Sequence, residues 1–419
     1  MGAMPDAAPA DASSSDERTT DGEPDAGSTG PETRSPNPSE PITISLLPSP
    51  NPLLPFQQAA EVSIAAHNGR VMIAAINLHT DASDTLTATP LLRGVGVATS
   101  SDWGNTFGPT VNPGFVATET SDPVVRASAD GSFWLAAIGI ESAGLAGEQH
   151  RGWLLRALPG RQSFAVIHDD LPVFDKEWIA PGWGGGLVMG AEGGFWRFTS
   201  EGIISASWIE GPDWPVFGAF DDARGVHFVI GGAVALWTGA PDLVPEGHLR
   251  SPSVVDNGWS VPIGALSDGG VWAVYGAESI GKDNQSHGTV IVRQFRSGDL
   301  EGQDVAIGDA GAMASFMPAA AMDDEGRLHV IWYDSSGASG VLKYARSIST
   351  DLDLGFSPAQ IVDPDACPGA GWFPAFAEGA PDRRLREYID LAIDARRVHM
   401  AWTHAPTLPS RIQTSHLDF

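Results

Sequence analysis

Cysteine is almost absent from this chain of 419 residues: Cys367 is the only one, so no disulfide can form within the chain. Positive charge is also scarce, because 24 lysine and arginine residues face 52 aspartates and glutamates, for a formal net charge of −28. Such a charge repels nucleic-acid phosphates and anionic membrane surfaces, so we expect neither as a partner. No run of about 18 apolar residues occurs, which argues against a membrane-spanning helix.

Residues 1–40 lack aromatic side chains, are rich in Ala, Pro, Ser, Asp and Glu, and contain only two bases, Arg18 and Arg34. Such a segment cannot bury enough apolar surface to offset the entropy lost on ordering, so we expect a disordered tail or linker over 1–40. Residues 1–4 resemble a remnant of an expression vector. The tail resembles the tether of a secreted, periplasmic or cell-surface protein, with a lipid anchor in the native form. An acidic solubility tail is the alternative.

Turn-forming residues are abundant instead, with 49 glycines and 32 prolines, and no long stretch has the 3.6-residue period of an amphipathic helix. The stretch 316–334 has the pattern of two short strands joined by a polar turn at 323–326. Strands at 340–347 and 356–362 would complete an antiparallel meander. This pattern recurs along the chain and predicts an all-β fold, a seven-bladed β-propeller of four-stranded antiparallel blades.

Seven segments rich in small and β-branched residues are the predicted first strands, where little room is left around a central axis. They are 61–65, 123–127, 177–180, 215–219, 262–266, 318–322 and 388–392. The propeller would span 41–419 at about 54 residues per blade. Strand 41–46 would supply the fourth strand of the last blade and close the ring. Six blades are the alternative if one of these segments is not a first strand.

Each first strand precedes a turn and a predicted second strand, and the turns include Asn68-Gly69 and Asp130-Gly131. The second strands are predicted at 71–77, 132–138, 186–191, 226–231, 271–277, 328–333 and 398–403. Tryptophans on these strands are expected to pack between blades: Trp134, Trp272, Trp332 and Trp402. Three histidines there are expected to be packing residues: His227, His329 and His399.

One hairpin sequence indicates a family. Ser100-Ser101-Asp102-Trp103-Gly104-Asn105-Thr106-Phe107 matches the Asp-box pattern S-x-D-x-G-x-T-F/W, and a degraded copy occupies 349–356. In such a hairpin the Asp accepts backbone N–H bonds, the Gly takes a positive φ, and the aromatic residue anchors the turn. The region 56–419 resembles the sialidase-like BNR/Asp-box propeller superfamily.

The chain departs from the catalytic pattern of that superfamily. Catalytic sialidases carry an Arg-Ile-Pro motif in the first blade, an arginine triad, a Tyr–Glu nucleophile pair and an Asp acid/base. Here the first blade has Phe56-Gln57-Gln58-Ala59, and the arginines Arg383, Arg384 and Arg386 are bunched at the last blade. The resemblance therefore implies the fold, and we do not expect sialidase activity itself.

Ligands of propellers bind where first strands begin, at the mouth of the central funnel, and several blades place a carboxylate there. Converging carboxylates raise each other's pKa unless a cation neutralises them, which suits acid/base chemistry or a calcium ion. The predicted catalytic residues are Asp122, Asp175, Glu177, Glu387 and Tyr388. The predicted substrate-binding residues are Arg386, Lys176, Trp214, Trp259, Tyr333, Asp334 and His404. The alternative is that each acid caps amides in its own loop.

No histidine pair has metalloprotease spacing, so a zinc site would have to be assembled from separate loops. Cys367 has no neighbouring base and is expected to be incidental. Two functions follow. The first is a secreted, sialidase-like propeller enzyme that acts on glycans or related polar substrates as a glycoside hydrolase or polysaccharide lyase. The alternative is a non-catalytic carbohydrate- or protein-binding propeller. We expect a monomer that binds a glycan or a small molecule. The sequence identifies no definite cofactor, and calcium is the one candidate.

Overall fold

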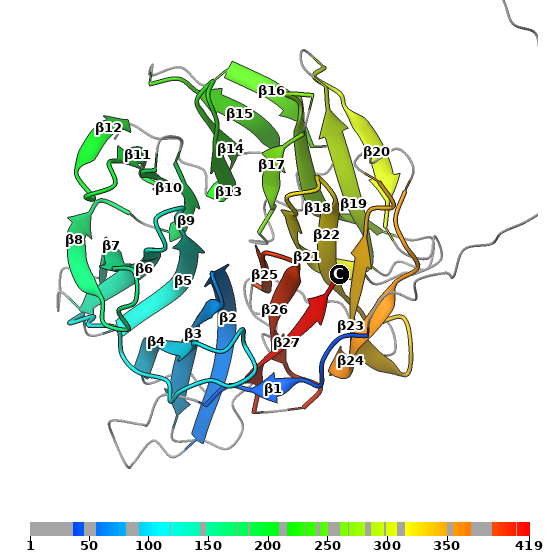
Figure 1. The fold of residues 1–419 in the computed structure, drawn as a ribbon, viewed down its shortest axis with the longest axis horizontal. Coiled ribbons are helices and arrows are strands. Elements are labelled where there is room, and N and C mark those ends of the chain that lie inside the picture. The colour runs from blue at the N-terminus through cyan, green and yellow to red at the C-terminus, as the bar shows by residue number, and fades with distance from the viewer. Residues whose placement is uncertain are drawn as a thin grey trace, which may run out of the picture. The chain divides into compact units, whose positions relative to one another are not determined.

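The protein is described by a computed structural model. It covers residues 37–45, 56–80, 92–117, 119–142, 148–173, 175–182, 185–208, 216–230, 232–239, 244–249, 260–266, 268–280, 286–296, 299–307, 315–349, 355–369, 388–407 and 409–419. Over these residues the regular structure is entirely β-strand, and every strand pairing is antiparallel (Figure 1). Residues Pro36–Phe419 form one compact unit.

Seven sheets stand around a common centre, which confirms the prediction of a seven-bladed propeller and excludes six blades (Figure 1). Each sheet is a blade, and its first strand lies nearest the axis. All seven predicted first strands are found. They are β2 (Phe56–His67), β5 (Glu119–Ala127), β9 (Asp175–Pro181), β13 (Val216–Asp221), β17 (Ile263–Ala265), β21 (Ser315–Met322) and β25 (Asp390–Asp394).

The remaining strands follow outward in chain order. The second strands are β3 (Arg70–Thr80), β6 (Phe133–Ser142), β10 (Leu187–Glu192), β14 (Val226–Ile230), β18 (Val271–Ile280), β22 (Leu328–Asp334) and β26 (Arg397–His404). The third strands are β4 (Leu92–Ser100), β7 (Glu148–Ala157), β11 (Gly194–Phe198), β15 (Ala233–Trp237), β19 (Ser286–Phe295), β23 (Ser339–Arg346) and β27 (Arg411–Asp418). The fourth strands are β8 (Ala165–Leu171), β12 (Ile204–Trp208), β16 (Val244–His248), β20 (Gln303–Ala306) and β24 (Gln360–Pro368).

The first and last blades are completed differently. The first sheet has three strands, and beside the third strand lies an isolated bridge between Val97 and Val111. The seventh sheet takes its fourth strand from β1 (Ile42–Thr43), in which Ile42 pairs with Thr414 of β27. An early segment and the last strand of the chain therefore share one sheet.

Tight turns connect the first and second strands because their residues accept positive φ. In the first blade Asn68 and Gly69 have φ values of 50° and 79°, the conformation that Asn-Gly hairpins favour. Gly131 takes the corresponding role in the second blade, with φ of 80°. The turn signals in the sequence therefore identified real hairpins.

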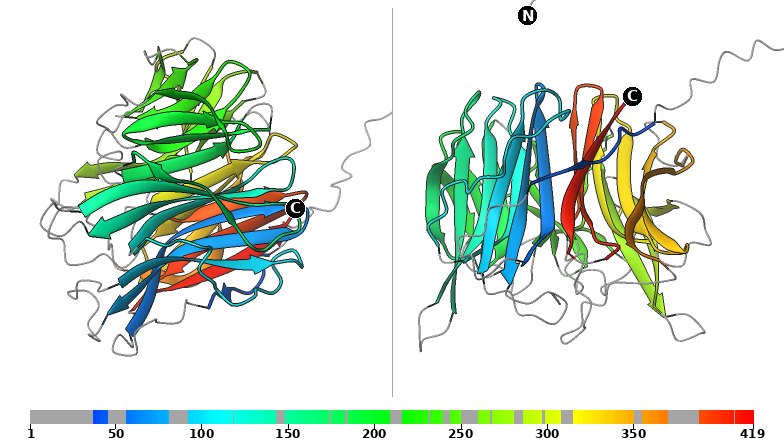
Figure 2. Two further views of the ribbon diagram at one scale, coloured as in Figure 1. Left: turned by 90° about the vertical axis from the view of Figure 1, so that its left-hand side faces the viewer. Right: turned by 90° about the horizontal axis from the view of Figure 1, so that it is seen from below.

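The core lies between the faces of neighbouring blades, which stand side by side in Figure 2. The four predicted tryptophans are all buried there, with exposures of 3% or less, so their packing role is confirmed: Trp134, Trp272, Trp332 and Trp402. Burial of each tryptophan removes a large apolar side chain from water and stabilises the fold by about 2–3 kcal/mol. The histidines of the second strands are also buried: His227, His329 and His399.

Candidate functional site

A repeated backbone irregularity shapes the start of the first strands. In β2 the pairing jumps from Ala60 to Ser63, and in β5 it jumps from Ser121 to Val124, so each strand has a β-bulge. The bulges contain Glu61 and Asp122, whose φ values are 52° and 51°. A bulge bends the strand and redirects its side chains, and a left-handed non-glycine residue costs about 1–2 kcal/mol. Such strain often accompanies functional sites.

The same irregularity recurs in the sixth blade but with a different side chain. The pairing of β21 jumps from Phe316 to Ala319, and Met317 in the bulge has φ of 54°. Proline follows the bulge residue in two blades, as Pro123 and Pro318. A missing N–H costs little there, because the ladder is already interrupted. The same β-bulge therefore occurs in the first, second and sixth blades, and the side chain at the bulge differs from blade to blade.

Tyr388 of the seventh blade occupies the corresponding place. It lies two residues before Asp390, the first residue of β25 to pair with the second strand, just as Glu61 precedes Ser63. Its ring is buried and contacts Trp178, with ring centroids 6.2 Å apart. Its hydroxyl donates to Oδ1 of Asp122 at 3.4 Å.

Carboxylates surround the Tyr388 hydroxyl and keep it protonated. Burial raises the pKa of Tyr388 well above its usual range. Nearby negative charges raise it further, in the order Asp122, Asp175, Glu61 and Glu177. These acids come from the first, second and third blades, while Tyr388 belongs to the seventh. The phenol can therefore donate a hydrogen bond or a proton, and its neutral form is strongly preferred over a phenolate nucleophile.

An open pocket of about 660 Å³ lies beside this cluster and is lined by Asp122 and Asp175. Positive and polar groups line it too, namely Arg93, Gln149, His150 and Arg151. The Arg93 guanidinium is 3.7 Å from a carboxylate oxygen of Glu119. Asp122 also accepts a hydrogen bond from the hydroxyl of Ser121 at 2.6 Å. The pocket thus places two carboxylates and two guanidinium groups around one volume.

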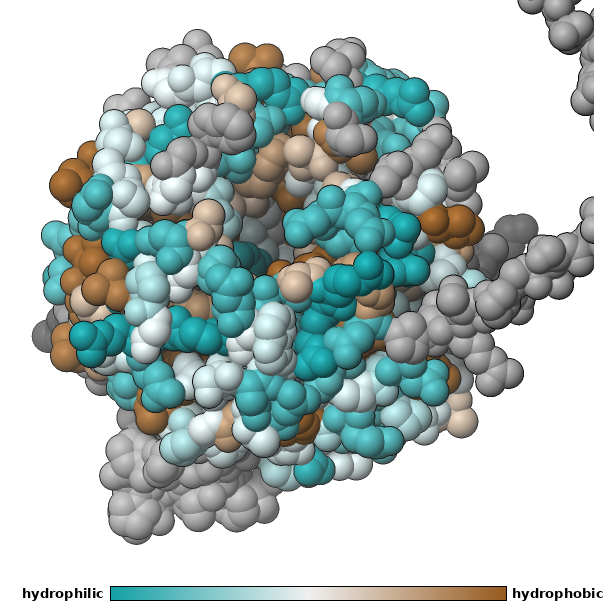
Figure 3. All heavy atoms as spheres, viewed as in Figure 1, coloured by the Kyte–Doolittle hydropathy of each residue, from teal (hydrophilic) through white to brown (hydrophobic). Residues whose placement is uncertain are grey.

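The central channel is a separate cavity of about 240 Å³, bounded by residues of all seven first-strand segments. Small side chains such as Ala65, Ala127 and Ala219 form much of its wall, and Figure 3 shows the molecule hollowed at the centre of the ring. Arg126 and Asp390 pair across this wall at 2.6 Å, and the Arg126 guanidinium stacks 5.1 Å from the Trp178 ring. This pair joins the second and seventh blades.

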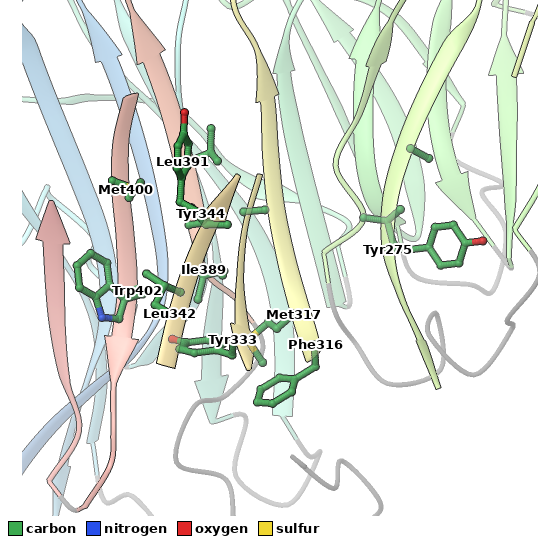
Figure 4. Packing of buried hydrophobic residues seen from close by; sticks show 14 of the residues in the cluster. Tyr275, Phe316, Met317, Tyr333, Leu342, Tyr344, Ile389, Leu391, Met400 and Trp402 are labelled. Carbon is green, nitrogen blue, oxygen red and sulfur yellow. The ribbon is translucent and has the colours of Figure 1, made fainter. Parts of the chain in front are cut away.

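Tyr333 was predicted to bind substrate, but the structure places it in the core between the sixth and seventh blades. It is fully buried, and its hydroxyl donates to the carbonyl of Thr403 at 2.7 Å. Figure 4 shows its ring among Met317, Leu342 and Ile389. The prediction is corrected: Tyr333 is a packing residue, because the strand alternation turns its side chain toward the neighbouring blade.

Asp334 is also internal rather than displayed to a ligand. It is 1% exposed, and its carboxylate accepts hydrogen bonds from Lys343 Nζ at 2.6 Å and from the Ser336 amide at 2.9 Å. Burial alone would raise its pKa, but these donors lower it, so the group is a carboxylate at neutral pH. Asp334 fits a structural role at the end of β22.

His404 is held by a carboxylate that the sequence analysis did not single out. Its Nδ1 is 2.7 Å from Oδ2 of Asp363, and the same oxygen accepts a hydrogen bond from Trp402 Nε1 at 2.8 Å. Burial would raise the pKa of Asp363, yet bonds from His404, the Asp365 amide and Trp402 lower it. The His404 ring is therefore oriented by an ionised partner.

Of the remaining predicted residues, Glu177 has a described side chain and the others do not. Glu177 lies in β9, is 1% exposed and belongs to the carboxylate cluster around Tyr388. Four residues lie outside the described residues: Trp214, Trp259, Arg386 and Glu387. Lys176 lies in β9, but its side chain is also outside the described part.

Two pocket residues were missed because they belong to third strands. Arg93 lies near the start of β4 and Arg151 near the start of β7, and third strands begin at the same end of a blade as first strands. A base within two or three residues of a third-strand start is the signal that could have found both.

The Asp102 hairpin has the local chemistry expected of the sequence pattern. Asp102 accepts hydrogen bonds from the hydroxyl of Ser100 at 2.7 Å and from the amide of Thr106 at 2.9 Å. These bonds, the Ser100 one foremost, lower the pKa of Asp102 to about 2. Gly104 has φ of 77°, and the half-buried ring of Phe107 packs on the core.

In the described part of the chain, no group of three or more His, Cys, Asp or Glu residues is placed to hold a metal ion. Nor does any helix in that part have the length and apolarity to cross a membrane. Cys367 is buried, and burial first and nearby carboxylates second raise the pKa of its thiol, which makes it unreactive at neutral pH.

No protein-family model and no curated protein matches the sequence. Solved structures do match. A protein of unknown function from Dyadobacter fermentans is 13% identical, with a TM-score of 0.54, over 92% of this chain and 100% of that one. At this identity the likeness shows the fold alone, and the class defined by the seven sheets is a seven-bladed β-propeller.

Two enzyme structures are more distant. The α-L-arabinofuranosidase Arb93A from Fusarium graminearum is 8% identical, with a TM-score of 0.49, over 91% of this chain and 98% of that one. A catalytically inactive virginiamycin B lyase from Staphylococcus aureus is 12% identical, with a TM-score of 0.48, over 91% and 99%. Neither likeness bears on the function of this chain.

Proposed function

We propose that the protein is an enzyme that cleaves glycans or related polar substrates, as a glycoside hydrolase or a polysaccharide lyase. The observation that carries the proposal is the contact between the Tyr388 hydroxyl and Asp122, where Asp122 also lines the open pocket with Asp175. Both reactions need one group that gives a proton and one that takes it. A neutral phenol beside a carboxylate supplies such a pair.

Each group has a role in this proposal. Asp122 and Asp175 act as the acid/base carboxylates, and Tyr388 donates its hydrogen bond to Asp122 or to the substrate oxygen that leaves. Arg93 and Arg151 line the same pocket and can hold an acidic substituent of the sugar, such as a uronate. In an elimination the arginines would also stabilise the charge that develops on that carboxylate.

Variation between blades favours one catalytic site over a repeated lectin site. The equivalent bulge positions hold Glu61, Asp122 and Met317, and Tyr388 takes that place in the seventh blade. A lectin propeller would repeat one aromatic and polar set in every blade. Here the side chains differ, so the chemistry is concentrated in neighbouring blades.

The proposal extends to family and location. The hydrogen bonds of the Asp102 hairpin support an Asp-box propeller of the sialidase-like type, and an acidic, proline-rich tail supports secretion or surface tethering. Fractionation of the native host, with antibodies against the propeller, would test the location. Recovery of the protein in the cytoplasm alone would contradict it.

The test of the activity is turnover of a panel of glycosides and uronate-containing polysaccharides by the wild type and single variants. We expect Asp122→Asn and Asp175→Asn each to lower kcat by about 100-fold or more, since acid/base groups contribute on that scale. Asp130→Asn is the matched control: this acid lies in the β5–β6 turn, bonded to Ser128, Ser132 and Arg156, and turnover should be unchanged.

The product distinguishes the two reaction types. An elimination leaves an unsaturated sugar that absorbs ultraviolet light, whereas a hydrolysis incorporates one oxygen from labelled water. Binding of a glycan without turnover by the wild type would replace the enzyme proposal with the non-catalytic one. Equal turnover by the wild type and both variants would remove the assignment of Asp122 and Asp175.

A further inference from the structure

A second pocket lies at the opposite ends of the strands, where the seventh blade meets the first. Its volume is about 440 Å³. It is lined by residues from the Asp102 hairpin and from the ends of β25, β26 and β27: Trp103, Asp394, Arg396, Arg397, Asp418 and Phe419. Tyr388 precedes the start of β25, whereas Asp394 ends that strand. The two pockets are therefore separate sites.

Trp103 is a large aromatic residue held at the surface against its usual preference. Its side chain contributes to a residue exposure of 41%, and its φ of 62° is a left-handed conformation that is strained for a bulky residue. Tryptophan at a buried position would gain apolar contacts that this one forgoes. Strain combined with exposure of a large ring points to a purpose other than folding.

The face of the Trp103 ring rests on the turn of the first blade. A Cβ atom placed on Gly69 would lie 2.8, 2.9 and 3.2 Å from Cε2, Nε1 and Cδ2 of the indole. Three ring atoms at nearly one distance mean that the flat face, and not the edge, covers the glycine. Only glycine leaves space for this arrangement, so the indole packs directly on the backbone of the turn at Gly69.

Hydrogen bonds fix the turn at Gly69 and the backbone of Trp103. The Trp103 amide donates to the Gly69 carbonyl at 2.9 Å, and Arg397 Nη1 donates to the Trp103 carbonyl at 2.9 Å. The Gly69 amide donates to Asp394 at 2.6 Å. Asp102 and Thr106 hold the hairpin from the other side. A ligand would therefore meet a pre-organised ring and lose little side-chain entropy on binding.

Charged groups beside the ring balance each other. The lining contains two guanidinium groups and two carboxylates. Arg397 Nη2 donates to Oδ2 of Asp418 at 2.9 Å, and Asp418 and Arg396 keep 60% and 70% of their side chains exposed. Arg396 Nε donates to the Phe419 carbonyl at 2.6 Å, and its Nη1 lies 3.7 Å from Glu325. The exposed groups offer donors and acceptors around an aromatic surface whose lining holds equal numbers of positive and negative side chains.

This combination selects the chemistry of the occupant. The lining offers a cation no net attraction, because Arg396 and Arg397 offset the charges of its two carboxylates. A polyanion would be opposed by the net charge of −28. A ligand that is neither a cation nor a polyanion avoids both problems. A neutral ring could stack its C–H face on the indole and direct its hydroxyl groups to the exposed Asp418 and Arg396. That description fits a neutral saccharide.

We propose that this pocket is a binding site for a neutral saccharide, with Trp103 as the stacking platform and Arg396 and Asp418 as hydroxyl partners. The site is independent of the pocket at Asp122 and does not require catalytic activity there. If the protein does act on a polysaccharide, this surface would hold a chain on the face away from the reaction.

The test is native gel electrophoresis of the full chain through gels that contain a neutral polysaccharide, with β-glucan, galactomannan and dextran used in turn. We expect at least one of them to retard the wild type. Trp103→Gly removes the ring and relieves the positive φ, and it should weaken binding by about tenfold or more. Trp103→Phe keeps a stacking ring and should retain most of the retardation.

Two further variants make the outcome specific. Val116→Ala, at a residue that is 84% exposed outside the pocket, should bind as the wild type does. Asp122→Asn should also bind normally, because it alters only the other pocket. The proposal is overturned if no neutral polysaccharide retards the wild type, or if Trp103→Gly is retarded equally. Loss of binding in Asp122→Asn alone would place the glycan at the Asp122 pocket instead.

Discussion

The hydroxyl of Tyr388 lies 3.4 Å from Oδ1 of Asp122, although the two residues are 266 positions apart in the chain. One belongs to the seventh blade and the other to the second, and the first blade lies between them in the ring. The contact depends on the bulge of β5, which turns Asp122 away from regular strand geometry. It is the basis of the proposed chemistry.

Tyr388→Phe should lower kcat by about 100-fold, because the variant loses the donor at Asp122 but keeps the buried ring. The matched control is Tyr333→Phe, which also removes the hydroxyl of a fully buried tyrosine, bonded here to the Thr403 carbonyl. That control should cost about 1 kcal/mol of unfolding free energy and leave turnover intact. Steady-state kinetics and urea denaturation measure both. Equal turnover in the two variants would show that the Tyr388 hydroxyl takes no part in the reaction.

Asp390→Ala should destabilise the ring. The Asp390 carboxylate accepts hydrogen bonds from Ser63 Oγ at 2.7 Å, the Ile64 amide at 3.1 Å and Arg126 Nη1 at 2.6 Å, so it links three blades. Its loss leaves a largely buried guanidinium without a counter-charge, and we expect the unfolding free energy to fall by about 3 kcal/mol.

The control for Asp390 is an exposed ion pair, Arg327–Glu325, with an N···O distance of 2.9 Å. Glu325→Ala should change the unfolding free energy by about 0.5 kcal/mol, because water screens the pair. Urea denaturation at constant pH gives both values. A loss for Asp390→Ala as small as that of the control would contradict the role of Asp390.

Acid should destabilise the sixth blade through His329. Burial lowers the pKa of His329 from 6.5 to about 4, although the Asp323 carboxylate, 3.0 Å away, opposes this. Tyr344 contacts the other ring nitrogen at 2.8 Å, and Arg346 and Arg327 lie near the ring. The folded protein thus prefers neutral imidazole, while the unfolded chain takes up a proton near its ordinary pKa.

The sign follows from this difference. Stability from neutral His329 is complete above about pH 6.5 and is lost progressively as the pH falls toward about 4. The pKa of Asp323 is lowered from 3.8, so the stability that this carboxylate contributes is fully present in this window and is lost only as the pH falls below it. In His329→Gln, the fall in unfolding free energy between about pH 7 and pH 5 should be smaller by about 2 kcal/mol. Urea titrations at several pH values measure it, and parallel pH profiles would contradict the assignment.

Gly104→Ala should destabilise the Asp102 hairpin for two reasons. Gly104 has φ of 77°, which costs an alanine about 1–2 kcal/mol, and the new Cβ would lie 3.1 Å from Nδ1 of His399. Gly355→Ala is the control, since Gly355 has φ of 83° but no atom within 4 Å of the added Cβ. Thermal unfolding of both variants separates crowding from backbone strain. A larger loss in Gly355→Ala would contradict the crowding against His399.

Local signals in the sequence were sufficient for the blades. The predicted second strand 328–333 corresponds to β22, Leu328–Asp334, and the first strand 318–322 lies within β21, Ser315–Met322. Both predictions depend on apolar alternation and on the polar turn at 323–326, where Gly326 has φ of 78° and the conformation is set by neighbours in the chain. Interactions of short range are visible in a sequence, and so the number of blades and the buried tryptophans could be predicted.

The bulges were not visible in the sequence. Asp122 and Glu61 have positive φ because the sheet gains an extra residue there, and neither residue type demands that conformation. Tyr333 was assigned to the mouth of the funnel because it lies at the end of a second strand, whereas it faces the neighbouring blade and is fully buried. The direction of a side chain at a strand end depends on the register with its partner strand.

By itself, the sequence determined that the chain forms seven antiparallel sheets and that acids stand at the openings of several of them. Only the tertiary structure decided that Asp122 meets Tyr388, that Arg93 and Arg151 share their pocket, and that Trp103 lies flat on Gly69 at the other end of the blades. The physical reason is that these contacts join residues from different blades. Their positions are fixed when the ring closes and not by the residues beside them in the chain.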